Sequence, residues 1–289
     1  MILSVEAGGR FGGLVVRALA CRGARVRSLV HKQEDFDRAQ ANGAREIVFG
    51  DLQDPKSLDA ALEDVEGVFY TAPAFQRNES TLGLGLVGAA RRAGVRRVVF
   101  SSVIHPTLDL ENHSEKIPVE AALYGSGMEF VVLHPAMFFQ DLELAWPAVR
   151  EGGKLSEPFS RKARIARVDY RDVADVAAVA LLDDRLTYGT FELCADEILN
   201  REEIAMLMSE VLGRYIEPAD STFDSWASKA GVPNDDRQRL LLKSMYDYYG
   251  MHDAYGNSLT LRMILGREPR TLRGYIEELA GVEQMRSVA

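Results

Sequence analysis

The residues with the clearest chemical potential form a glycine-rich turn near the start of the chain. This turn comprises Gly8, Gly9, Arg10, Phe11 and Gly12. An apolar run, 1–5, precedes it and an amphipathic run, 14–21, follows it. A strand, a glycine turn and a helix in this order are typical of dinucleotide-binding sites, where the pyrophosphate lies on free N–H groups at the helix start. We therefore expect these five residues to contact a dinucleotide.

A second chemical signal lies at the end of the next expected strand, 25–30, where His31 and Lys32 follow. A site for NAD usually carries Asp or Glu there, to bind the ribose 2′-hydroxyl. Here the first acid is Glu34. Because lysine binds phosphate as a point charge, His31 and Lys32 favour the 2′-phosphate of NADP over NAD. The alternative is two solvated side chains at a strand end.

Other catalytic patterns are absent from the sequence. The five histidines are scattered, without H-E-x-x-H or a Cys/His cluster, so we expect no metal site. No G-x-S-x-G is present, which argues against a hydrolase of the nucleophile-elbow type.

The elements that must position these residues alternate along the first half of the chain. The expected strands are 1–5, 25–30, 46–49, 67–71, 98–102 and 130–133, and the expected helices are 14–21, 34–42, 55–62, 80–93 and 116–124. Such alternation favours βαβ units with right-handed crossovers. The predicted fold class is α/β, a doubly wound parallel Rossmann-type sheet with a smaller, mostly helical lid domain.

The alternation of expected strands and helices becomes less regular after Pro135. The later helices have clear boundary signals in the sequence. Asn200 and Glu203 have capping-box spacing, and Gly213 ends that helix. The expected domains are a dinucleotide-binding domain at 1–150, continued by about 163–195, and a substrate or lid domain at 151–162 and 196–289. The lid is expected over the carboxyl ends of the strands, where ligands bind in such folds.

Composition limits the classes of partner. The chain has 289 residues, 47% of them hydrophobic, and a formal net charge of −9, so it can bury a full core and is a poor nucleic-acid binder. Cys21 and Cys194 form no CxxC, which suits a reducing compartment. We see no signal peptide and no apolar run of membrane-spanning length. We expect a cytoplasmic protein, a monomer or homodimer, with no nucleic-acid or membrane partner.

Several short segments, in order along almost the whole chain, resemble the NmrA-like group of atypical short-chain dehydrogenases. The matching segments are the glycine turn, 50–52, 69–73, 101–106, Asn112-His113-x-x-Lys116, 133–136, Val168-Asp169-x-x-Asp172-Val173-Ala174 and 265–269. The resemblance implies an NAD(P)-binding Rossmann fold. The group includes NAD(P)H-dependent reductases of quinones, azo dyes and triphenylmethane dyes, and also non-catalytic NADP sensors.

The resemblance also implies roles for individual residues. It places Asp51 and Leu52 beside the adenine, Thr71, Ala72 and Pro73 beneath the nicotinamide ribose, Ser101 and Ala136 at the cofactor, and Lys116 on the ribose. For Asp51 the alternative is a turn cap, and for Ser101 a hydrogen bond to backbone within the core.

Ordinary short-chain dehydrogenases use Tyr-x-x-x-Lys, in which the tyrosine moves a proton to or from the substrate. Here no lysine has Tyr four residues before it, and Lys116 has Asn112. We therefore name Lys116 and His113 as catalytic candidates, with Tyr124 as another proton donor. A structural role is the alternative for His113 and Tyr124.

A flat aromatic substrate is expected to stack on aromatic side chains near the strand ends. The candidates are Phe75, Phe138, Phe139 and Tyr124. Packing between lid and core is the alternative. The small-molecule substrate is expected to be aromatic.

Glu6 stands where the resembling proteins have their first glycine. A carboxylate near the pyrophosphate would weaken dinucleotide binding. Three functions stay open. The first is an NAD(P)H-dependent reductase of a quinone-like or conjugated aromatic compound. The second is an NADP sensor acting on a partner protein, and the third is a redox-neutral enzyme that has lost the cofactor.

Overall fold

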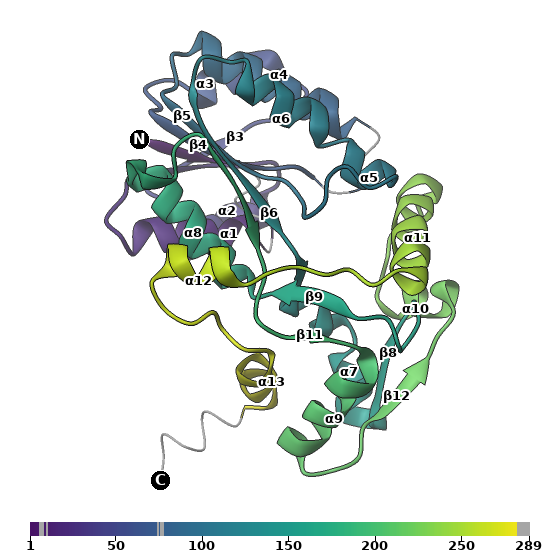
Figure 1. The fold of residues 1–289 in the computed structure, drawn as a ribbon. Coiled ribbons are helices and arrows are strands. Elements are labelled where there is room, and N and C mark those ends of the chain that lie inside the picture. Colours follow the sequence, from purple (N-terminus) through teal and green to yellow (C-terminus); the bar gives the residue numbers. More distant parts are fainter. Residues whose placement is uncertain (6–8, 10, 74, 76–77, 282–289) are drawn as a thin grey trace. The chain divides into compact units, whose positions relative to one another are not determined.

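A seven-stranded sheet organises the first of two compact units (Figure 1). The computed structural model describes residues 1–5, 9, 11–73, 75 and 78–281. This unit comprises Met1–Pro135 and Tyr170–Glu192. Its strands are β1 (Ile2–Ser4), β2 (Val26–Val30), β3 (Glu46–Phe49), β4 (Gly67–Thr71), β5 (Arg97–Ser101), β6 (Glu129–Pro135) and β10 (Gly189–Leu193), which ends one residue beyond the unit.

The strand order is β10-β6-β5-β4-β1-β2-β3, and the pairs from β6 through to β3 are parallel. This arrangement confirms the expected doubly wound parallel sheet. Strand β5 ends at Ser101, one residue earlier than expected, and strand β6 extends to Pro135. Because these strands are parallel, their carboxyl ends meet at one edge of the sheet. Most of the predicted cofactor residues lie at this edge.

Helices cover both faces of the sheet (Figure 1). They are α1 (Gly12–Ala20), α2 (Gln33–Ala41), α3 (Pro55–Ala61), α4 (Glu79–Arg92), α5 (Glu111–Ser114), α6 (Ile117–Tyr124), α8 (Tyr170–Leu182) and the 3₁₀ turn η2 (Asp184–Leu186). Helix α1 packs against α8 on one face, and α4 packs against α3 and α6 on the other. Apolar residues of the sheet, α3, α4 and α6 form a shared core, including Leu3, Val68, Leu86, Phe100 and Val119.

Local signals in the sequence explain several helix boundaries. Helix α3 begins after Asp54, whose side chain accepts a hydrogen bond from the Lys56 N–H at 3.0 Å. Pro55 then occupies the first helical position, where its missing N–H costs nothing. Helix α1 differs, because Phe11 at its N-cap makes no side-chain capping bond.

The second unit comprises Ala136–Asp169 and Leu193–Ala289, of which residues up to 281 are described. It contains β7 (Met137–Phe138), β8 (Lys154–Glu157), β9 (Ile165–Val168), β11 (Ile198–Leu199) and β12 (Glu217–Asp220). Its helices are η1 (Phe139–Leu144), α7 (Trp146–Gly152), α9 (Arg201–Leu212), α10 (Phe223–Lys229), α11 (Asp236–Met251), α12 (Leu259–Leu265) and α13 (Leu272–Ala280). The structure thus assigns 136–150 to this unit, whereas the sequence placed that stretch in the dinucleotide-binding domain.

The second unit has its own apolar core, built from η1, α7, α9 and α13 with residues such as Phe139, Val149, Met208 and Ile276. Helix α9 begins with the expected capping box, since Asn200 and Glu203 bond each other's backbone N–H groups, and Gly213 follows it in a left-handed conformation. Within the described residues, no helix is both long and apolar enough to cross a membrane.

Candidate functional site

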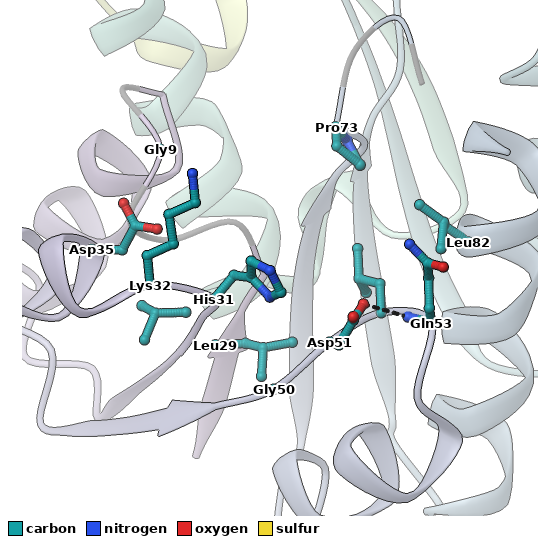
Figure 2. Close-up of a pocket in the computed structure, with 12 residues that line it drawn as sticks. Gly9, Leu29, His31, Lys32, Asp35, Gly50, Asp51, Gln53, Pro73 and Leu82 are labelled. Carbon is teal, nitrogen blue, oxygen red and sulfur yellow. Dashed lines mark hydrogen bonds between the residues drawn. The ribbon is translucent and has the colours of Figure 1, made fainter. Parts of the chain in front are cut away.

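A cavity of about 340 Å³ lies at the carboxyl edge of β2 and β3, within the first unit. Its lining residues are Gly9, Leu29, Val30, His31, Lys32, Asp35, Gly50, Asp51, Leu52, Gln53, Pro73 and Leu82. Figure 2 shows Lys32 and Asp35 on the same wall as Gly9, with Pro73 and Leu82 opposite. The size falls in the range of small-molecule sites. Residues predicted separately from four segments therefore line one cavity.

The side chains of the cavity carry both signs of charge. His31 and Lys32 are exposed at the end of β2, as the sequence analysis requires of groups that contact a 2′-phosphate. The Asp51 carboxylate instead accepts a hydrogen bond from the Gln53 N–H at 2.8 Å, seen in Figure 2. The turn-cap alternative for Asp51 is therefore also present in the structure.

Asp35 is a cavity residue that sequence reasoning missed. It lies in the first turn of α2, and its carboxylate is 3.8 Å from the Arg38 guanidinium. The available signal was its place three residues after Lys32, at the N-terminus of an expected helix. An acid there would oppose a phosphate bound by Lys32, because both carry negative charge.

A second cluster joins the ends of β4 and β5. The hydroxyl of Tyr170, the first residue of α8, lies close enough to the side chains of Ser101 and Thr71 for both to influence its pKa. The Phe11 ring packs on Tyr170 with 4.4 Å between ring centroids. Burial raises the pKa of Tyr170 to about 12, so its hydroxyl stays protonated at neutral pH. The structure brings together three predicted cofactor residues around Tyr170, which the sequence analysis did not name.

Lys116 immediately precedes α6 and is largely buried. Its ammonium forms an ion pair with Glu79, the first residue of α4, and donates a hydrogen bond to the Asn112 carbonyl at 3.0 Å. Burial raises the pKa of Glu79, although the nearby ammonium opposes this shift. Glu79 was not named from the sequence, because its contact with Lys116 joins the start of α4 to a residue far along the chain, between α5 and α6.

His113 has no exposed surface, and burial lowers its pKa to about 4. The Nδ1 atom lies 3.1 Å from the His105 carbonyl oxygen, so this ring nitrogen donates a hydrogen bond to the loop after β5. A neutral, fully buried imidazole is poorly suited to protonate a substrate. The structure therefore favours the structural alternative for His113 over the catalytic one.

Tyr124 belongs to a different cluster, centred on Glu120 of α6. The Tyr124 hydroxyl donates to one carboxylate oxygen at 3.1 Å, while Ser102 and His134 bond the other at 2.6 and 2.9 Å. Burial raises the pKa of Glu120, but the hydrogen bonds from His134 and Ser102 outweigh it, so the pKa is lowered overall. The Tyr124 ring also packs on Phe130, with centroids 5.0 Å apart. These contacts are consistent with the structural alternative for Tyr124.

The remaining predicted residues are distributed over both units. Phe75 lies after β4 with φ of 64°. Phe139 is 1% exposed and packs in the core of the second unit, near Tyr275, which favours the packing alternative for this residue. Phe138 is half-buried, and Ala136 is buried and donates its N–H to the Leu193 carbonyl.

Glu6, Gly8 and Arg10 lie outside the described residues. Elsewhere, the described part of the chain contains no group of three His, Cys, Asp or Glu side chains that could hold a metal ion.

The parallel doubly wound sheet and the cavity at its carboxyl edge define a Rossmann-type protein. The chain belongs to the NmrA-like family, whose profile matches residues 1–285.

Among curated relatives, the chain is 27% identical to an NAD(P)H azoreductase of Xenophilus azovorans over 283 residues, which cover 94% of this chain and 95% of that one. The triphenylmethane reductase of Citrobacter sp., solved with NADP(H), superposes with a TM-score of 0.83 at 20% identity, covering 96% of this chain and 100% of the other. The NADPH-dependent quinone oxidoreductase of Escherichia coli, solved with NADPH, gives a TM-score of 0.81 at 21% identity, covering 96% and 99%. These two likenesses support the fold.

Proposed function

We propose that this protein is an NADPH-dependent reductase of a quinone-like or other conjugated aromatic compound. The observation that carries the proposal is the cavity at the carboxyl ends of β2 and β3, in which His31 and Lys32 take the place of the usual ribose-binding acid. The family and the azoreductase relative support the same reading.

The residues present fit the adenosine half of a dinucleotide. Leu29, Leu52 and Leu82 supply apolar walls to a cavity of about 340 Å³, and Lys32 supplies a cation for the 2′-phosphate. At the other end, Lys116 has two of its three ammonium hydrogens bonded to Glu79 and Asn112. Within the part of the chain that the structure describes, the third hydrogen is left for a ribose hydroxyl. When bound, the nicotinamide supplies the hydride.

The chain's own residues bind and orient more than they transfer protons. Tyr170 lies beside Ser101 and Thr71 at the ends of β5 and β4, and the Lys116 ammonium supplies a positive charge held by its ion pair with Glu79. Because His113 is buried and neutral, we assign the proton that completes the reduction to water. A quinone-like acceptor suits such a site, since its reduced oxygens are readily protonated by solvent.

The experiment that tests the proposal is a calorimetric titration of the purified protein with NADPH and NADH, followed by turnover assays on quinones and azo dyes. We expect tighter binding of NADPH and oxidation of NADPH in the presence of a quinone. Binding of neither cofactor would overturn the proposal and favour a redox-neutral enzyme.

A second candidate is an NADP sensor that regulates a partner protein. The burial of His113 favours it, because the residue named from the sequence as a proton donor is enclosed. Tight NADPH binding without turnover on any acceptor would favour the sensor.

A further inference from the structure

Glu79 is one of the few acidic side chains buried in the first unit. It opens α4 and is 2% exposed. A buried carboxylate is costly unless charges and hydrogen bonds compensate it, so its partners identify its role. Helix α4 follows the connection from β4, whose end carries the predicted cofactor residues Thr71, Ala72 and Pro73.

The Glu79 carboxylate has partners on two separate segments. It pairs with the Lys116 ammonium, and the Phe75 backbone lies close enough to the carboxyl to lower its pKa, against the larger effect of burial. A parallel link lies next to it, because the Ser80 N–H donates to the Glu115 carboxylate at 3.0 Å. The start of α4 is thus tied at two adjacent residues to the segment between α5 and α6.

The Phe75 contact is informative because Phe75 has φ of 64°. A bulky residue rarely adopts this left-handed conformation, and such strain persists only where surrounding contacts enforce it. The carboxylate of Glu79 supplies one such contact. Strained backbone of this kind is concentrated at functional sites.

We infer that Glu79 is a positioning residue that holds the Lys116 ammonium and the Phe75 backbone as a single unit. For its meaning in cofactor binding, this inference rests on the proposed function. Phe75 and Lys116 were named independently as a substrate contact and a cofactor contact. One buried carboxylate therefore sets the positions of two groups from different parts of the chain.

Among the described residues, three other titratable groups act on the Glu79–Lys116 pair or on the histidine beside it. Glu115 repels the Glu79 charge, and His113 lies close enough to influence Lys116 but is neutral because it is buried. His105, on the loop after β5, faces His113. A histidine side chain carries no negative charge, so neither His105 nor His113 can replace the Glu79 carboxylate as the partner of Lys116.

The test compares Glu79→Gln, Lys116→Met and the double variant in the protein labelled with ¹⁵N-phenylalanine. Without cofactor, we expect both single variants to shift the Phe75 amide resonance, because each breaks the same unit. With NADPH, each single variant should weaken binding at least tenfold, and the double variant should be no weaker than Lys116→Met alone. Glu79→Asp, which keeps the charge, should restore part of the affinity.

Asp247→Asn is the matched control, since it breaks an ion pair with Lys243 in which both side chains are about half exposed. It should leave the Phe75 resonance and NADPH affinity unchanged. An unshifted Phe75 resonance in Lys116→Met, or additive losses in the double variant, would overturn the inference. If the wild type binds no dinucleotide, the proposed function fails while the resonance still decides the inference. If Glu79→Gln does not fold, Lys116→Met and Glu79→Asp provide the same comparison.

Discussion

Lys32 and Asp35 place opposite charges on one wall of the cofactor cavity. The lysine favours a 2′-phosphate, whereas the carboxylate favours a ribose hydroxyl and repels phosphate. Arg38 lies 3.8 Å from Asp35 and reduces its effective charge. If the protein binds NADP as proposed, the balance between these residues sets the ratio of its affinities for NADP and NAD.

Replacing both His31 and Lys32 by Ala should weaken NADPH binding about tenfold more than NADH binding, because a hydrogen bond to a charged group contributes roughly 1.5–3 kcal/mol. Asp35→Asn should shift the ratio in the opposite direction. Calorimetric titration of each variant with both cofactors measures the two ratios. Equal losses for NADPH and NADH would show that these residues do not read the 2′-phosphate.

Glu6 lies outside the described residues, and its prediction rests on the sequence. If the turn requires positive φ there, a non-glycine residue costs roughly 1–2 kcal/mol. A carboxylate about 5 Å from a phosphate charge adds roughly 3 kcal/mol of repulsion at an effective dielectric of about 20. Glu6→Gly should therefore tighten NADPH binding at least tenfold by calorimetry. If the wild type already binds at micromolar strength and Glu6→Gly changes nothing, the turn tolerates the acid.

At the scale of elements, Arg97 joins strand β5 to the end of helix α8. The side chain is 1% exposed, and its guanidinium donates to the carbonyls of Ala180 and Asp183 at 3.0 and 2.8 Å. These carbonyls belong to the last turn of a helix and the residue after it, where intrahelical partners are missing. Glu129 and Asp184 balance the positive charge.

Arg97→Ala should lower the free energy of unfolding by about 1–3 kcal/mol, because it removes the donor from the buried Ala180 carbonyl. The neighbouring Arg96 is the control. It also contacts Glu129, but its side chain is 46% exposed, so Arg96→Ala should cost less than about 1 kcal/mol. Urea unfolding of the two variants makes the comparison. Similar losses would mean that Arg97 does not stabilise the end of α8.

The elements that the sequence predicted well are those with local signals. Strand β4 has the predicted bounds, and α4 differs from the prediction by one residue at each end. Alternating apolar runs and capping residues encode such elements within a few residues. Pairing of β8 with β12 was not predicted, since residues as far apart as Lys154 and Glu217 pair there. No local sequence pattern indicates that these two strands pair.

The site residues divide in the same way, into those that a local sequence pattern indicates and those that depend on long-range packing. His31, Lys32 and Pro73 follow strand ends, and their convergence on one cavity follows from the parallel sheet. Tyr170, Glu79 and Asp35 depend on where helices pack, which the sequence does not show. The burial of His113 and Phe139 has the same origin, because a residue type does not reveal which side of a helix faces the core.

Across the whole molecule, buried titratable groups couple folding to pH in opposite directions. Burial raises the pKa of Glu79 and lowers that of His113. The folded protein therefore binds a proton more readily than the unfolded chain at Glu79, and less readily at His113. As pH falls, the first effect adds stability and the second removes it.

The contribution of His113 has a defined window. Its pKa falls from 6.5 to about 4 on folding, so between these values the unfolded chain holds a proton that the folded state rejects. Stability then rises with pH by up to about 1.4 kcal/mol per unit, and about 3 kcal/mol is lost between pH 7 and pH 4.

His113→Gln keeps a hydrogen-bond donor for the His105 carbonyl but cannot titrate. The wild type should therefore lose stability relative to this variant as pH falls through the window, whereas other titrating groups, Glu79 included, act on both proteins alike. Urea unfolding at pH values from 4 to 7 gives the difference at each pH. Parallel curves would show that His113 titrates normally in the folded protein, and its structural assignment would then fail.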